Sequence, residues 1–153
     1  MNEDKKHFLK VEFLPLLSKL HAEDKGKWGV LNAQQMVEHF ADAVKIANGK
    51  LTVPVLNEGE TLAKYREFLM SENPMRENTK NPLMSEEPAA LRAANMEAAL
   101  AKLQSELNHF FEIHEQDSST KHNNPFFGEL DYAQQVQLLH KHAIHHLKQF
   151  DLV

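Results

Sequence analysis

Histidines are the residues of this chain best suited to chemistry, because the sequence contains ten of them and no cysteine. Five of the ten lie within the last 32 residues, and among these five only His142 and His146 are four positions apart. Side chains at this spacing lie side by side on one face of a helix, with Cβ atoms roughly 5–6 Å apart. Two such imidazoles could hold one metal ion at nitrogen–metal distances of about 2.0–2.1 Å.

The helix that carries this pair is predicted to begin after Asp131 and to run to about residue 149. Asp131 and Gln134 form the S/T/D/N-x-x-E/Q pattern of a capping box at its start. On a helical wheel, His142 and His146 lie at one edge of the apolar face. The same wheel predicts that His140 is packed in the core and that His145 faces outward.

A third histidine, His39, lies at the edge of the apolar face of a second predicted helix, residues 33–48. Three neutral imidazoles around one ion leave a coordination position open, which is typical of catalytic metal sites. The neighbouring acids Glu38 and Asp42 are expected on the solvated face of this helix. The alternative is that all three histidines only pack against the apolar core.

Other helices must position the two helices that carry these histidines. Apolar residues at steps of three and four predict a first helix over residues 5–21, with a kink or an early end at Pro15. The helix over residues 33–48 should start with a capping box formed by Asn32 and Gln35. Residues 51–57 are expected to be an extended connection, because Pro54 interrupts a short β-like run.

The second half of the chain adds a modest helix over residues 58–70 and a long one over residues 86–115, capped by Ser85. A loop is expected between the long helix and the last one. The resulting fold class is all-α, a four-helix bundle with the 58–70 helix as an excursion. No internal boundary is visible, so residues 1–153 are predicted to form one domain.

Composition excludes several functions. The net charge of −5 at pH 7 argues against nucleic-acid binding, which requires a basic surface. The absence of cysteine excludes disulfides, thiolate-bound zinc, iron–sulfur clusters and a thiol nucleophile within the chain. No apolar run is long enough to span a membrane and the first residues lack a secretory signal, so we expect a cytoplasmic protein.

Common catalytic motifs are also missing. The zinc-protease pattern H-E-x-x-H requires a glutamate after the first histidine, whereas Ala143 follows His142. The sequence contains no G-x-S-x-G elbow, no phosphate-binding Walker loop and no dinucleotide-binding fingerprint. Any metal chemistry would therefore rest on nitrogen and oxygen ligands in an arrangement other than that of the zinc proteases.

Two segments resemble the DinB-like superfamily, which includes the YfiT-like metal-dependent hydrolases. They are WGVLNAQQMVEHF (Trp28–Phe40) and NNPFFGELDYAQQVQLLHKHAIHHLKQF (Asn123–Phe150). The chain is similar to a branch of bacterial domains of unknown function in that superfamily. It departs from the H-R-G-Q ending of many relatives, since Leu147 and Lys148 replace the Arg-Gly pair while Gln149 is retained.

The resemblance implies a bundle of up-down-down-up order, often a homodimer, with a divalent metal such as nickel or zinc on three histidines. Carried over to this sequence, the ligands are His39, His142 and His146. Trp28, Phe126, Phe127 and Gln149 are candidate residues for binding a small-molecule substrate. For Trp28 and the two phenylalanines, core packing and turn formation are at least equal alternatives.

The resemblance further implies a metal-dependent hydrolase or a thiol-dependent S-transferase. In the second case a low-molecular-weight thiol would be the co-substrate, so the absence of cysteine is no obstacle. The alternative from a different class is a non-catalytic helical bundle with a structural or assembly role. Metal content separates the two hypotheses.

Overall fold

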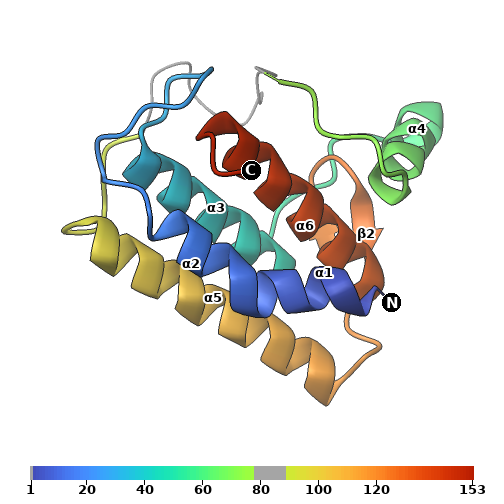
Figure 1. Ribbon diagram of the computed structural model, residues 1–153. Helices are drawn as coiled ribbons and strands as arrows, with labels where there is room; N and C mark the ends of the chain where they lie inside the picture. Colours follow the sequence, from blue (N-terminus) through green and yellow to red (C-terminus); the bar gives the residue numbers. More distant parts are fainter. Residues whose placement is uncertain (1, 78–88) are drawn as a thin grey trace.

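The computed structural model describes residues 2–77 and 89–153 (Figure 1). The described chain is mostly α-helical, in agreement with the predicted all-α class, and its sheet is a single two-stranded hairpin. No helix in these two ranges combines the length and apolar character needed to cross a membrane. In chain order the elements are α1 (Glu3–His7), a π-helical turn η1 (Phe8–Glu12), α2 (Phe13–Leu17), α3 (Ala33–Ala47), α4 (Gly59–Met70), α5 (Met96–Gln116), β1 (His122–Asn124), β2 (Gly128–Leu130) and α6 (Tyr132–Gln149).

The first helix is continuous from α1 through η1 to α2, although it ends at Leu17 and not at residue 21. Pro15 lies inside this continuous helix, in α2, and the helix goes on for two more residues after it. The irregularity precedes the proline: η1 widens the helix, and the N–H of Phe13 donates to the carbonyl of Phe8, five residues back. The helix thus ends four residues before the predicted residue 21, soon after Pro15, and it contains a π turn that was not predicted.

The two helices that carry the histidines begin where capping boxes were predicted. In α3 the Asn32 side chain accepts from the N–H of Gln35, and in α6 the Asp131 side chain accepts from the N–H of Gln134. Each glutamine side chain in turn accepts from the backbone N–H of its capping residue. These caps set the first residue of each helix and hence the direction in which the histidines project.

The start of α5 differs from the prediction. Ser85 and residues 86–88 lie outside the described residues, but residues 89–95 are described and are not helical. Their backbone is bonded to α3 instead: the Glu38 carboxylate accepts from the N–H groups of Arg92 (2.8 Å) and Ala93 (3.3 Å). Asn95 then caps α5 by accepting from the N–H of Ala98. Tertiary hydrogen bonds outweigh local helix propensity in this segment.

The segment expected to be a loop before α6 contains the hairpin β1–β2. Its turn is made by Asn124, whose side chain accepts from the N–H groups of Phe126 and Phe127, and by Gly128 at φ +79°. Arg66 of α4 donates to the carbonyls of Phe127 and Glu129, so the hairpin and α4 form one unit.

The main hydrophobic core collects side chains from η1, α2, α3, α5 and α6. Helices α3 and α5 pack against each other, and in Figure 1 the first helix is seen between them, along α5. The contacts of α6 reach the first helix, α3 and α4, which places α6 against both the core and the α4 excursion. The largest fully buried aromatic residues of the core are Phe13, Phe40 and Phe110.

Candidate metal centre

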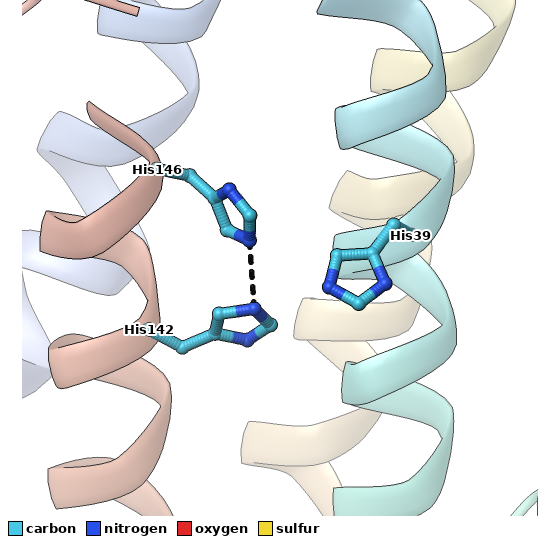
Figure 2. Close-up of side chains that lie close together, drawn as sticks. All are labelled: His39, His142 and His146. Carbon is cyan, nitrogen blue, oxygen red and sulfur yellow. Dashed lines mark hydrogen bonds between the residues drawn. The ribbon is translucent and has the colours of Figure 1, made fainter. Parts of the chain in front are cut away.

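Three imidazoles converge between α3 and α6 (Figure 2). One ring nitrogen of each of His39, His142 and His146 can be chosen so that all three lie within 4.8 Å of one another. The Nε2 atoms of His142 and His146 are 2.8 Å apart, and the His39 ring centre lies 5.2 Å and 5.3 Å from those of His142 and His146. The structure therefore brings together the three residues that the sequence singled out.

The spacing is near what one metal ion requires. Two nitrogens bound at about 2.0–2.1 Å are about 2.9 Å apart at the 90° angle of an octahedral ion and about 3.4 Å apart at the tetrahedral angle of zinc. The two Nε2 atoms share a hydrogen bond at 2.8 Å, so they would separate slightly to hold a tetrahedral ion. His39 approaches from the opposite helix, so the three rings surround a common point and do not lie in one stack (Figure 2). This set of nitrogen donors fits a divalent ion of the zinc or nickel type.

The electrostatic environment keeps the three rings neutral. Burial lowers the pKa of His39, and it lowers that of His142 well below the usual value, with further lowering by the neighbouring histidines. For His146, burial and the neighbouring His39 lower the pKa to about 3. Neutral imidazoles offer lone pairs, which is the state that metal binding requires.

Nearby acids are turned away from this centre. Glu38 is buried rather than solvated, because its carboxylate binds the backbone of residues 92 and 93. Asp42 pairs with the Arg92 guanidinium through two hydrogen bonds, of 2.8 Å and 3.1 Å. Neither carboxylate belongs to the group that could hold an ion, although the charge of Asp42 acts on the pKa of His39 in the direction opposite to burial.

Gln149, predicted to bind substrate, lies beside the ligands. Its side chain is buried at 4% exposure, and its Oε1 atom is 2.7 Å from Nδ1 of His146. Its Nε2 donates to the backbone carbonyl of Trp28 at 2.8 Å. Gln149 therefore contacts both a ligand residue and the loop, and its role in substrate binding stays a prediction.

The ring of Trp28 reaches the same region from the loop before α3. It lies 5.6 Å from the ring of His145, which is half-buried and itself 5.1 Å from the ring of His146. The prediction that His145 points outward is therefore wrong, because the loop folds back over this part of α6. His140 is half-buried rather than enclosed, and its ring packs edge-on against Phe8 at 5.2 Å.

Phe126 and Phe127 belong to a second, smaller hydrophobic cluster formed by the hairpin, α4 and the first half of α6. Their rings lie 6.5 Å and 5.6 Å from that of Tyr65 in α4. This packing supports the alternative reading of the two residues, and their role in substrate binding stays a prediction.

The centre is also distinct from the cavity of about 300 Å³ on the outer side of α3. That cavity is lined by charged side chains of α3, α5 and the 92–93 segment, and by three alanines; none of the three histidines lines it. The candidate site therefore rests on its convergent ligands and not on a large hollow.

Comparison of the chain with protein-family models, with curated proteins and with solved structures finds no match. The assignment of a function consequently depends on the geometry of the three histidines.

Proposed function

We propose that this protein is a divalent-metal-dependent enzyme whose ligands are His39, His142 and His146. The observation that carries the proposal is the convergence of three uncharged imidazoles from two helices on one point. In the metal-free protein Nε2 of His142 and Nε2 of His146 share a hydrogen bond at 2.8 Å, so the proposal rests on the arrival of a third imidazole, His39, from the facing helix α3. We also propose the up-down-down-up bundle order and a homodimer, on the resemblance of the sequence to the DinB-like superfamily. A cytoplasmic location is proposed because the sequence shows no secretory signal and no apolar run of membrane length.

Three neutral nitrogen ligands favour the binding of an anion in the open coordination position of the ion. Among the described residues, Glu38 and Asp42 bind residues 92 and 93, so neither carboxylate joins the three histidines as a ligand of a divalent ion. Such an ion supplies Lewis acidity, which lowers the pKa of a water or a thiol in the open position. Both hydrolysis and thiol-dependent S-transfer to a small molecule use this property, with a low-molecular-weight thiol as co-substrate in the second case.

The residues of the chain would hold the ion and the substrate in position. His39 on α3 and the pair on α6 hold the ion between two packed helices, and the Trp28 ring with His145 borders the same region. A small organic substrate is the expected ligand there, since aromatic side chains provide apolar contact area beside the polar centre.

Metal analysis of tag-free protein tests this proposal. After incubation with Ni²⁺ or Zn²⁺ and removal of free ions, we expect about one ion per chain in the wild type and a large loss in His142→Ala. The matched control is His140→Ala, because His140 lies two residues away on α6 but packs on Phe8. A wild type that remains metal-free, or a His142→Ala variant that retains the ion, would overturn the proposed site.

Turnover distinguishes the reactions. Activated esters and electrophiles would be offered to the metal-loaded wild type with and without small thiols, and the products identified. Hydrolysis without thiol indicates a hydrolase, and thioether formation indicates an S-transferase. A protein that binds one ion but turns over none of these substrates would favour the non-catalytic alternative, a bundle that the ion only stabilises.

A further inference from the structure

The side-chain amide of Gln149 lies between a metal-ligand candidate and a backbone carbonyl, which restricts its orientation. A carbonyl oxygen only accepts, so the amide NH₂ must face Trp28, where the observed distance is 2.8 Å. The amide oxygen then faces Nδ1 of His146 at 2.7 Å, and this oxygen also only accepts. Nδ1 of His146 must therefore carry the proton, and in the neutral ring Nε2 keeps its lone pair.

The loop before α3 holds this amide closely. The backbone N–H of Lys27 donates to the backbone carbonyl of Gln149 at 2.7 Å. A Cβ atom on Gly26 would lie 2.8 Å from Cγ of Gln149, and one on Gly29 would lie 2.9 Å from its Nε2. Gly29 also has φ +79°, so the loop uses glycine both for its backbone conformation and for its approach to Gln149.

We propose that Gln149 is a positioning residue that fixes the tautomer of His146, and that the loop of residues 25–31 exists in part to hold its amide. The proposal rests on the proposed metal site. It implies that His142 and His146 are protonated on different ring nitrogens. Because Nε2 of His146 accepts, Nε2 of His142 must donate across the 2.8 Å between them in the metal-free protein. Metal binding through Nε2 of His142 would require the proton of that ring to move to its Nδ1, so that the ring stays neutral, while His146 presents its lone pair without rearrangement.

Two variants test this role. Gln149→Leu removes the amide at similar volume. Gly29→Ala keeps Gln149 but places a methyl group against its Nε2, and its matched control is Gly59→Ala. Gly59 also has a positive φ of +58°, but a Cβ atom there meets nothing within 4 Å, so the control carries similar backbone strain without touching Gln149.

The primary readout is the tautomer in metal-free protein, measured from histidine ¹⁵N chemical shifts at neutral pH and assigned by comparison with His146→Asn. We expect His146 to be protonated at Nδ1 and His142 at Nε2 in the wild type and in Gly59→Ala. Gln149→Leu and Gly29→Ala should populate both tautomers of His146. Their affinity for Zn²⁺, measured against a competing chelator, should fall about 10–100-fold.

Two results would overturn the positioning role: a wild-type His146 protonated at Nε2, or unchanged tautomer and affinity in Gln149→Leu. Circular dichroism of each variant confirms that it is folded. If the wild type binds no metal, the proposed function fails, and the tautomer measurement still decides whether Gln149 positions His146.

Discussion

At the scale of single residues, Glu106 is a fully buried carboxylate in the middle of α5. Its oxygens accept from Asn48 (3.0 Å), Lys50 (2.9 Å) and Lys102 (3.1 Å). Burial alone would raise the pKa of Glu106, but hydrogen bonds from these three side chains outweigh it and lower the pKa to about 2. The group ties the end of α3 to α5 as long as it remains ionised.

The lowered pKa makes stability depend on pH in the acid range. The folded protein holds the Glu106 proton less tightly than the unfolded chain, whose value is 4.5. The stabilisation is therefore complete above about pH 5 and is lost as the pH falls toward 2. The difference between a pKa of 4.5 and one of about 2 corresponds to about 3 kcal/mol for this single group, and less at high salt because both lysines are half exposed.

Urea unfolding as a function of pH would measure this contribution. Glu106→Gln should be less stable than the wild type at neutral pH and should lose less stability on acidification. Glu112→Gln, an exposed carboxylate on the same helix, is the control. Parallel pH profiles for the wild type and Glu106→Gln would contradict the assignment.

The candidate metal ligands could be predicted from the sequence because they depend on short-range geometry. The four-residue step from His142 to His146 and the position of His39 on an apolar face follow from helical periodicity. The contact of the Gln149 amide with Trp28 could not be predicted, since it depends on a loop more than a hundred positions earlier in the chain. Gly26 and Gly29 flanking Trp28 were the only local signal of that loop.

At the scale of elements, local caps and tertiary contacts compete. Asn32 and Asp131 start α3 and α6 where predicted, because a capping box is complete within four residues. The predicted start of α5 was wrong, because Glu38 and Gln34 of α3 bind the backbone of residues 92 and 93. The hairpin was missed since strands of three residues show too little alternation to be recognised.

Glu38 should therefore be important for stability, because its carboxylate accepts hydrogen bonds from the backbone of residues 92 and 93. In Glu38→Ala the N–H groups of Arg92 and Ala93 lose their acceptor. We expect the free energy of unfolding to fall by about 1–3 kcal/mol, measured by urea denaturation. Glu67→Ala, at an exposed position of α4, should change it by less than about 0.5 kcal/mol. Equal effects of the two variants would show that the 92–93 segment contributes nothing.

At the scale of the whole molecule, the centre joins two helices that also meet through the core. An ion that binds only the folded protein stabilises it by about 2.7 kcal/mol at a hundred times its dissociation constant. For a chain of this size, that corresponds to an increase of about 5–10 °C in the melting temperature. Calorimetry with Zn²⁺ or Ni²⁺ should show this increase in the wild type. An equal increase in His142→Ala would assign it to binding elsewhere.

The position of the ligands along the chain also has a kinetic consequence. His39 and the pair on α6 are separated by about a hundred residues, so the centre is complete only after α3 and α6 have met. An interaction that forms after the rate-limiting step of folding lowers the unfolding rate and leaves the folding rate unchanged. A bound ion would thus prolong the lifetime of the folded state, while the speed of folding would still be set by the packing of the helices.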